Sequence, residues 1–484
     1  METDGGKIDL LNEKNNHSVA AIIESIKAKR WYPFKPESGL QFNVLDSIPA
    51  VVERNKPFIL LLKPDRIGDL ILSAAPVITW DDGSQERESV RITDSIESGS
   101  FLQFIEDIVK NRNAEGRHGK LGLEGEFIAE FASHFNAGTS LTPLNIEQSN
   151  SSFVIGDQFI CKFMRKVEPG ENPDITIPHK LYMETQFRNT PRPIGQLVYR
   201  DRQPFTLMSI HSFIRNQGDY WKHFTEEAAS MAEREKPGSA AGGKEYNEKL
   251  AVPTGEIARV IGEMHMSLAK LNGKDYAPLP AGENYISSMK KGYLQMVQML
   301  GKAGKILETG NERVNVEELS TDLELILHKI NFSAFSGSKI IRIHGDLHLG
   351  QILKTESGPM VIDFEGEPLR PLKERSMKQS PLKDVAGIIR SIDYAMNFNN
   401  RADPSDSEKF IAYSEGLRKR FLEEYWEVSS GFGLLPDSFA KYESISQFFE
   451  LEKAIYELNY EISNRPEWSG IPAKAIFRIM KRFQ

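Results

Sequence analysis

Residues 341–353, IRIHGDLHLGQIL, decide how this sequence is interpreted, together with residues 361–368, VIDFEGEP. Each stretch begins with a short apolar run that leads to an aspartate, Asp346 in the first and Asp363 in the second. Short apolar runs bounded by polar and turn-forming residues are typical of buried strands. We therefore expect two strands here, each carrying a carboxylate near its end.

The spacing of the polar residues suggests a phosphoryl-transfer site. This reaction needs a carboxylate for the proton of the attacking hydroxyl, oxygen ligands for Mg²⁺, and a cation beside the phosphates. Asp346 is followed five residues later by Gln351. The offset equals that from Asp to Asn in the protein-kinase catalytic loop, and Ile-Asp-Phe at 362–364 stands where that fold carries Asp-Phe-Gly. Asp346, Gln351 and Asp363 can therefore meet the first two requirements.

The cation is expected in an earlier pair of strands. Residues 149–164, SNSSFVIGDQFICKFM, read as a hairpin with its turn at Gly156–Asp157, and the second strand carries Lys162. Taken alone, a lysine on an alternating strand usually faces water, and a lone HGD is usually a turn. The order of the three motifs in matching secondary structure favours the phosphate site.

The segment before this hairpin is a second candidate for phosphate contact. It lacks a Gly-x-Gly-x-x-Gly motif, but its small polar residues could present N–H groups and hydroxyls to phosphate oxygens. A simple solvated loop is equally compatible with its composition. The residues concerned are Gln148, Ser149, Asn150, Ser151 and Ser152.

Composition bounds the possible partners and the cellular location. The net charge of -8 argues against nucleic acid as a partner, because phosphate-backbone binding needs concentrated Lys and Arg. No apolar run approaches the roughly 20 residues that span a bilayer, and the first residues show no signal-peptide pattern. The single cysteine, Cys161, excludes an internal disulfide and a cysteine-cluster zinc site. We expect a cytoplasmic protein with no membrane partner.

The 484 residues predict two or three domains. The polar start predicts a mobile terminus, apolar runs predict two successive sheet regions, and helical periodicity dominates the rest. Residues 233–249 are polar and glycine-rich and read as a flexible excursion. The expected organisation is a flexible N-terminus at 1–17, a small sheet region at 18–110, a second sheet region with Lys162 at 111–214, and a helical lobe at 215–484.

Longer motifs closely resemble the maltokinase family. They are RIHGDLHLGQIL, residues 361–395 from VIDFEGEPLRP to RSIDYA, and residues 452–472, EKAIYELNYEISNRPEWSGIP. The resemblance implies an α+β, bilobal protein-kinase-like fold of the aminoglycoside phosphotransferase type, with an N-terminal cap, an intermediate ATP-binding subdomain and a large helical C-lobe. It also implies transfer of the ATP γ-phosphate to the anomeric hydroxyl of maltose, with Mg²⁺, in α-glucan and trehalose metabolism. A functional association with trehalose synthase or maltosyltransferase would fit that role.

The resemblance assigns roles by position. Asp346 becomes the catalytic base, Gln351 and Asp363 the Mg²⁺ ligands, and Lys162 the contact to the α- and β-phosphates. Adenine is expected to meet the backbone of a hinge segment around Met208 to Phe213, in which Met208 and Ile210 are the named contacts. His348 is expected either to touch sugar or phosphate or to pack. Thr176 replaces an acid common in the family, which leaves Asp174 or Glu184 as the partner of Lys162.

A helix near the C-terminus is the predicted sugar site. One of its faces groups aromatic and polar residues at three- and four-residue spacing, namely Tyr456, Glu457, Tyr460, Glu461 and Asn464. Aromatic faces stack on pyranose rings and carboxylates accept hydroxyl protons, although a solvated helix is the alternative. Further candidates are Arg465, Trp468 and Asp393.

Two other functions remain open. A related group of kinases on the same scaffold phosphorylates glucosamine and carries Trp-x-x-x-Thr-Lys near the C-terminus, whereas this chain reads WSGIPAK from Trp468. The second alternative is a non-catalytic regulator that binds sugar or nucleotide. Retention of Asp346, Asp363 and Lys162 argues against it.

Overall fold

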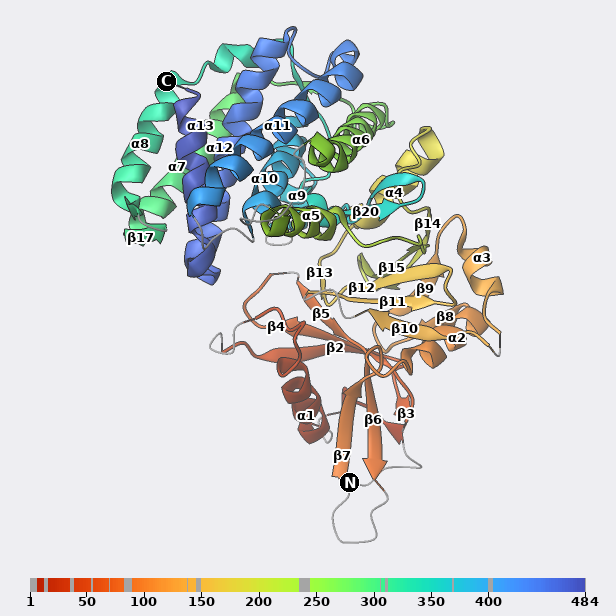
Figure 1. The fold of residues 1–484 in the computed structure, drawn as a ribbon. Helices are drawn as coiled ribbons and strands as arrows, with labels where there is room; N and C mark the ends of the chain where they lie inside the picture. Colours follow the sequence, from red (N-terminus) through yellow and green to blue (C-terminus); the bar gives the residue numbers. More distant parts are fainter. Residues whose placement is uncertain are drawn as a thin grey trace. The chain divides into compact units, whose positions relative to one another are not determined.

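The computed structural model describes residues 7–483 except for short segments. These are residues 13–15, 35–38, 54, 69, 82–88, 137, 145–148, 235–243, 305, 310–311, 368–369 and 399–403. The chain forms two compact units (Figure 1). The first comprises Met1–His179 and Pro191–Ile214, and the second comprises Lys180–Thr190 and Arg215–Gln484.

The N-terminal part of the first unit is a small sheet packed against a helix. The four-stranded sheet has the order β13-β5-β4-β2, and the apolar residues of β4 are buried at its centre. Helix α1 contributes Ile22 and Ile26 to the same core, next to Trp31. The elements are α1 (Asn16–Lys27), β2 (Phe42–Ile48), β4 (Ile59–Pro64), β5 (Ile71–Ala74) and β13 (Lys166–Val167), with the pairs β1 (Lys7–Ile8) and β3 (Val52–Glu53), and β6 (Pro76–Asp81) and β7 (Ser89–Asp94).

The second sheet of this unit has seven antiparallel strands in the order β10-β11-β12-β15-β14-β9-β8. Helix α2 (Phe101–Asn111) buries Phe101, Phe104, Ile105 and Ile108 in this core. The strands are β8 (Asn113–Glu115), β9 (Lys120–Glu124), β10 (Leu141–Leu144), β11 (Ser151–Ile155), β12 (Phe159–Phe163), β14 (Pro193–Arg200) and β15 (Pro204–Ser212), and the short helices are α3 (Ile128–Ser133) and α4 (Pro173–Glu184).

The predicted hairpin at 149–164 is confirmed as β11 and β12. Both turn residues adopt positive φ, 57° at Gly156 and 54° at Asp157, and the turn is closed by the Gln158 N–H donating to the Ile155 carbonyl. Two successive residues with positive φ match the twist of the flanking strands. The ladder sets Lys162 directly opposite Ser152 on β11 and Ser209 on β15.

The second unit is mainly helical, as predicted. Its long helices surround α10, in which every residue from Val385 to Met396 is buried. Figure 1 shows this helix among its neighbours α5, α11, α12 and α13, which pack against it. The helices are α5 (Tyr220–Arg234), α6 (Lys244–Leu268), α7 (Glu283–Ala303), α8 (Val316–Lys329), α9 (Leu372–Arg375), α10 (Leu382–Phe398), α11 (Pro404–Ser429), α12 (Phe439–Asn464) and α13 (Gly470–Lys481).

Short strand pairs complete this unit. The pair that concerns the site is β20 (Ile352–Thr355) with β21 (Gly358–Val361), an antiparallel hairpin. The others are β16 (Leu279–Pro280) with β19 (Lys339–Ile340), and β17 (Ile306–Thr309) with β18 (Glu312–Asn315).

Two predictions about local structure were wrong. The strand expected around residues 339–347 is only two residues long, because Ile341 forms only an isolated bridge with Gln379 and the N–H groups of His344 and Gly345 donate to the Asp384 side chain. The flexible excursion expected at 233–249 is helical at both ends, since α5 extends to Arg234 and α6 begins at Lys244. Its middle, 235–243, lies outside the described residues.

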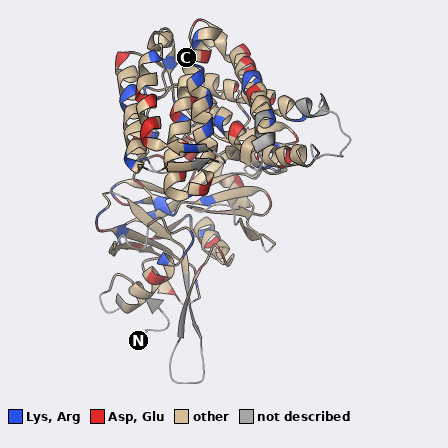
Figure 2. Ribbon diagram, turned by 60° about the vertical axis from the view of Figure 1, so that its left-hand side comes forward, with Lys and Arg blue, Asp and Glu red and all other residues tan. Residues whose placement is uncertain are grey.

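The surface carries both signs of charge. Figure 2 shows Lys and Arg interspersed with Asp and Glu along the helices of the second unit. Within the described parts of the chain, every helix is too short or too polar to cross a membrane.

Candidate active site

The loop that carries Asp346 is shaped by a carboxylate from helix α10. Asp384 Oδ2 accepts a hydrogen bond from the His344 N–H at 2.8 Å, and its Oδ1 accepts one from the Gly345 N–H at 3.0 Å. Helix α10 touches the loop directly, because a Cβ added at Gly387 would lie 2.3 Å from the Leu347 carbonyl oxygen. The loop is therefore anchored one residue before Asp346.

A second layer of buried residues holds this anchor. His265 Nε2 of α6 lies 3.1 Å from Asp384 Oδ2, and His265 Nδ1 lies 2.8 Å from the Tyr425 hydroxyl of α11. A proton on Nε2 lets His265 donate to the carboxylate and accept from Tyr425. Burial alone would raise the pKa of Asp384, but the His265 hydrogen bond and the Gly345 N–H hold that pKa below its ordinary value. Asp384 is thus kept ionised as an acceptor.

His344 joins the loop to the segment that carries Asp363. Its Nε2 donates to the Ile362 carbonyl at 2.9 Å, and its Nδ1 lies 3.4 Å from the Asp346 backbone N. Its ring also lies against the ring of Phe364, with centroids 4.9 Å apart. The bracing role of His344 thus brings the neighbourhoods of Asp346 and Asp363 together.

The β20–β21 hairpin brings Gln351 to Asp363. Gln351 ends a short 3₁₀ turn just before β20, and Asp363 lies two residues after β21. The Ile362 N–H donates to the Gln351 carbonyl, and the Gln351 side-chain amide donates to Asp363 Oδ2 at 3.0 Å. Asp363 has a φ of 65°, a strained backbone conformation that concentrates at functional positions.

The Gln351–Asp363 pair has the chemistry of a partial Mg²⁺ site. Carboxylate and amide oxygens are hard ligands, and Mg²⁺ commonly takes one or two carboxylates plus substrate phosphates. Within the described ranges, no group of three or more His, Cys, Asp or Glu could hold a metal by itself. The pair therefore offers two oxygen ligands of the kind that Mg²⁺ accepts.

Asp346 lines a pocket of about 120 Å³, roughly ten times the space one water needs. The wall is formed by the Asp346 loop, by the segment that follows Asp363, and by helices α10 and α12. Half-buried Tyr456 on α12 lies among charged residues here, namely Glu367, Arg370, Lys383, Glu452 and Lys453. The lining also includes the polar residues Glu374, Arg375, Gln379 and Asp384 and the apolar residues Met296, Ile343, Leu347, Met377 and Phe449. Such a mixed wall suits a small polyhydroxylated molecule.

His348 is held in place beside this pocket. Its Nδ1 accepts from the Gly350 N–H at 3.1 Å, which leaves Nε2 as the ring nitrogen that can face a ligand. Burial lowers the pKa of His348, although the charge of Asp346 opposes that shift. A side chain at Gly350 would clash with the ring, because its Cβ would lie 2.9 Å from His348 Cε1.

The predicted sugar face on α12 divides between different surroundings. Tyr456 lines the pocket with Asp346, whereas Glu457 is ion-paired with buried Arg390 at 2.7 Å. Tyr460 is 41 % exposed and lies under the guanidinium of Arg465. Only the first turn of the expected face therefore reaches the pocket.

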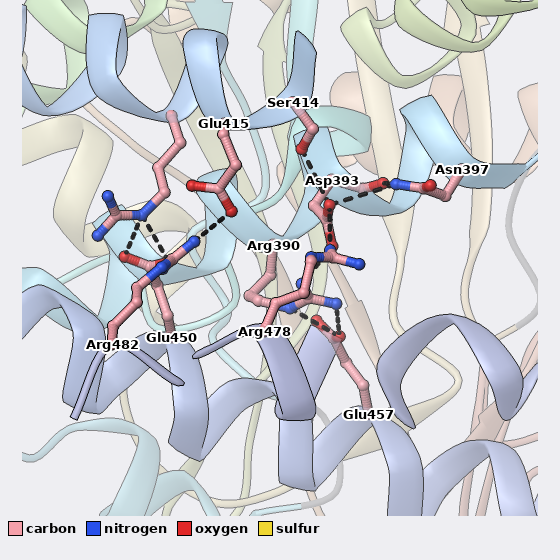
Figure 3. A network of polar contacts seen from close by, with 10 residues as sticks. Arg390, Asp393, Asn397, Ser414, Glu415, Glu450, Glu457, Arg478 and Arg482 are labelled. Atoms are coloured by element: carbon pink, nitrogen blue, oxygen red, sulfur yellow. Dashed lines mark hydrogen bonds and ion pairs between the residues drawn. The ribbon is translucent and has the colours of Figure 1, made fainter. Parts of the chain in front are cut away.

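Asp393 lies in a buried ion-pair network (Figure 3). Arg478 of α13 contacts both of its carboxylate oxygens at 2.7 Å, and Arg390 contacts Oδ2 at 2.5 Å. Ser414 and Asn397 also donate to Oδ1. With these donors around it, Asp393 has the surroundings of a structural residue rather than a sugar contact.

The remaining predicted sugar residues lie beyond this network, at the end of α12. Glu461 accepts from the Tyr394 hydroxyl at 2.9 Å and pairs with Arg465 at 2.8 Å. Arg465 also lies over the ring of Trp468, and Asn464 donates to the Tyr460 carbonyl within the helix. These contacts link the end of α12 to α10.

The predicted phosphate lysine lies in the first unit. Lys162 is half-buried on β12, opposite Ser209. The Ser209 hydroxyl donates to buried Asp174, whereas Glu184 belongs to the second unit and pairs with Lys180. Of the two acids considered as its partner, Asp174 is the one beside the Lys162 ladder position.

The loop before β11 is tied down by Arg165. The Asn150 side-chain oxygen accepts from the Arg165 N–H, and Ser151 Oγ accepts from Arg165 Nε at 2.9 Å. Arg165 is itself buried, with its guanidinium paired to Asp94 at 2.7 Å and stacked 4.1 Å from the Trp31 ring. Ser149 belongs to this loop, and Gln148 lies outside the described residues.

Met208 and Ile210 do not lie in an open hinge. Both are buried in the middle of β15, with β12 on one side and β14 on the other. Neighbouring strands therefore flank the backbone of these two residues, whereas Phe213, at the end of the expected segment, lies beyond β15. The chain leaves this ladder after Ser212 and passes to the second unit after Ile214.

Sequence reasoning missed the supports of the site. Asp384 and His265 were not among the predicted residues, although a carboxylate within the apolar run of α10 was a visible signal. Lys453 was also missed, although it precedes Tyr456 by three residues and so shares its side of α12. Its ammonium lies 4.8 Å from the centroid of the Tyr456 ring.

Comparison with curated proteins finds glucosamine kinases among the relatives of this chain. No protein-family model matches the chain. It is 23% identical over 288 residues to a glucosamine kinase from Streptacidiphilus jiangxiensis, an alignment that covers 58% of this chain and 60% of the relative. It is also 23% identical over 257 residues to a glucosamine kinase from Mycolicibacterium smegmatis, covering 52% and 58%. The chain thus spans about three fifths of the length of these curated relatives.

Solved structures extend the similarity to nearly the whole chain. A glucosamine kinase structure (crystal form B) superposes with a TM-score of 0.63 at 17% identity, covering 95% of this chain and 99% of that one. A glucosamine kinase in complex with glucosamine, ADP and inorganic phosphate gives a TM-score of 0.61 at 18% identity, covering 93% and 98%. The predicted α+β, protein-kinase-like fold is confirmed: this chain has the fold of the glucosamine kinases of known structure.

Proposed function

We propose that this protein is an ATP-dependent sugar kinase. The observation that carries the proposal is the joint position of three groups within one unit. Asp346 faces a mixed polar and apolar pocket, and His344 joins its loop to the segment of Asp363, which meets Gln351. That arrangement supplies a base, an acceptor pocket and a partial metal site. The similarity to glucosamine kinases supports the same reaction class.

In the proposed reaction, Asp346 accepts the proton of one sugar hydroxyl while that oxygen forms a bond to the γ-phosphorus. The bond from phosphorus to the bridging oxygen breaks, and ADP leaves with the electron pair. Lys162 would contact the α- and β-phosphates, and small polar residues at Ser149–Ser151 would contribute further phosphate contacts. Gln351 and Asp363 would hold Mg²⁺, which neutralises charge on the phosphates.

Two acceptors are supported by different observations. The long motifs around the site resemble maltokinases, and WSGIPAK lacks the Thr-Lys expected of the glucosamine enzymes, which favours maltose. The relatives described above are glucosamine kinases, which favours glucosamine. Maltose remains our first choice. Its use by this chain, and any association with trehalose synthase or maltosyltransferase, are predictions.

A sugar panel tests the proposal. The full chain is incubated with ATP and Mg²⁺ and with maltose, glucosamine or glucose, and products are assigned by phosphorus NMR. We expect ADP formation that depends on sugar, and a 1-phosphate from maltose. If glucosamine is the only sugar phosphorylated, and the product is a 6-phosphate, glucosamine would replace maltose as the proposed acceptor. ATP binding without phosphorylation of any sugar would favour the non-catalytic regulator.

A further inference from the structure

The pocket contains a second carboxylate, Glu367, that the sequence motifs did not single out. Glu367 is half-buried and lines the pocket together with Asp346 and Tyr456. Arg370 Nε donates to Glu367 Oε2 at 2.6 Å, and the Tyr456 hydroxyl also forms a hydrogen bond with this carboxylate. Two side chains from different elements therefore fix its position.

The backbone explains why Glu367 comes to this place. The chain between Asp363 and Glu367 passes close to the Asp346 loop, and a Cβ added at Gly345 would lie 3.5 Å from the Gly366 Cα. Both glycines have positive φ, 89° at Gly345 and 72° at Gly366, which glycine adopts without strain. The close approach of these two turns brings Glu367 to the same pocket as Asp346.

Glu367 keeps unused hydrogen-bonding capacity. An ionised carboxylate offers about four acceptor positions. Within the described residues, its side-chain donors are Arg370 and Tyr456, one bond each. Arg370 balances the charge of Glu367, so the remaining positions suit a neutral hydroxyl, and a hydroxyl bound to a carboxylate makes a strong hydrogen bond.

We propose that Glu367 is a specificity-determining residue that accepts a hydrogen bond from a second hydroxyl of the acceptor sugar. This inference rests on the proposed kinase function. Asp346 takes the reacting hydroxyl, and Glu367 holds another hydroxyl of the same molecule. The distance between the two carboxylates then selects which sugar hydroxyl is phosphorylated. The acceptor class is a polyol with at least two hydroxyls that reach the pocket together.

The alternative is that Glu367 only clamps Arg370 and Tyr456. A purely structural clamp would affect every acceptor alike, whereas a bound hydroxyl makes the effect depend on that hydroxyl. The test is therefore a double-mutant cycle in which one change is made in the residue and the other in the substrate. The enzyme variant is Glu367→Gln, and the substrates are the sugar that the wild type phosphorylates and its singly deoxygenated analogues.

We expect Glu367→Gln to lower kcat/KM for the full sugar by roughly 10- to 100-fold, with the KM for ATP changed less than twofold. For one deoxy analogue, the kcat/KM of the wild type should fall by a similar factor relative to the full sugar. For the variant, the same analogue should cause no further fall in kcat/KM. Glu318→Gln, on the exposed side of α8, is the matched control and should behave as the wild type.

Equal losses with every analogue, or no loss with the full sugar, would overturn the inference. If Glu367→Gln fails to fold, the wild type still tests the inference. The inference would be contradicted if the kcat/KM of the wild type fell by less than tenfold with every deoxy analogue. A wild type that phosphorylates no sugar would instead remove the proposed function, so the two failures can be told apart.

Discussion

At the scale of single residues, the geometry of the proposed Mg²⁺ ligands, Gln351 and Asp363, depends on the short hairpin that joins them. Asp363 takes a φ of 65°, and the Gln351 amide, 3.0 Å away, is fixed by the β20–β21 hairpin. Gln reaches one methylene further than the Asn of protein kinases, and the hairpin sets where that longer arm ends. The two side chains are therefore positioned by the hairpin and by their mutual hydrogen bond.

The pair predicts how metal and nucleotide binding are linked. Asp363→Asn keeps the size of the side chain but removes the charge that attracts Mg²⁺. We expect the affinity for ADP in the presence of Mg²⁺ to fall at least tenfold, with the affinity in EDTA unchanged. Calorimetric titration of the full chain under both conditions measures this. Asp322→Asn, exposed on α8, is the control, and an unaltered gain from Mg²⁺ in Asp363→Asn would argue against the metal role.

At the scale of elements, the Asp346 loop owes its shape to side-chain acceptors rather than to a strand. Asp384 accepts from two successive backbone N–H groups of the loop and is supported by His265. These partners come from α10 and α6, which lie far from the loop in sequence. The loop is thus a product of the packed helical unit.

Asp384→Asn should therefore impair turnover more than binding. The new amide places an N–H₂ group against a loop N–H, which shifts Asp346 relative to its acceptor. A displacement of about 1 Å can lower the rate by about 100-fold, so we expect kcat to fall by that order while both KM values change less than tenfold. Steady-state kinetics measure this. A kcat within threefold of the wild type, in a variant with native circular dichroism, would contradict the anchoring role.

The same elements show what sequence patterns can predict. The helical character of residues 215–484 and the hairpin at 149–164 were predicted because their periodicity or turn chemistry is local. The strand before Asp346 was wrong because Asp384, the group that replaces a neighbouring strand, lies about forty residues away. The sugar face of α12 was only partly predictive, because helical spacing cannot tell which side chains meet Arg390 or Arg465 and which meet the pocket.

At the scale of the whole molecule, ion pairs close the helical unit around α10. Figure 3 shows Arg478 of α13, and Arg482 directly after that helix, reaching acids of α10, α11 and α12. Arg482 pairs with Glu450 at 3.0 Å, and Arg478 with Asp393 at 2.7 Å. Burial by itself would raise the pKa of Asp393, but the charges of Arg478 and Arg390 hold that pKa below its ordinary value.

The sign of this shift gives a stability prediction. A depressed pKa in the folded state adds stability that is present at neutral pH and is lost as the pH falls through about 4 and below. Arg478→Met should lower the free energy of unfolding by roughly 2–4 kcal/mol at pH 7, because a buried carboxylate loses a partner. The difference from the wild type should shrink as the pH falls through about 4 and below. Denaturant titrations at several pH values measure the difference in free energy of unfolding between Arg478→Met and the wild type. A difference that is absent or independent of pH would contradict the role of this ion pair.

In the proposed reaction, Asp346 takes the proton of a sugar hydroxyl during transfer from ATP. The most direct measurement is phosphorus NMR of matched reactions with the wild type and Asp346→Asn, which preserves side-chain size but removes the base. The account predicts a sugar phosphate from the wild type, at least a 1,000-fold slower appearance from the variant, and similar binding of ADP with Mg²⁺ by both. Sugar phosphate formed by Asp346→Asn at a rate within tenfold of the wild type would contradict it.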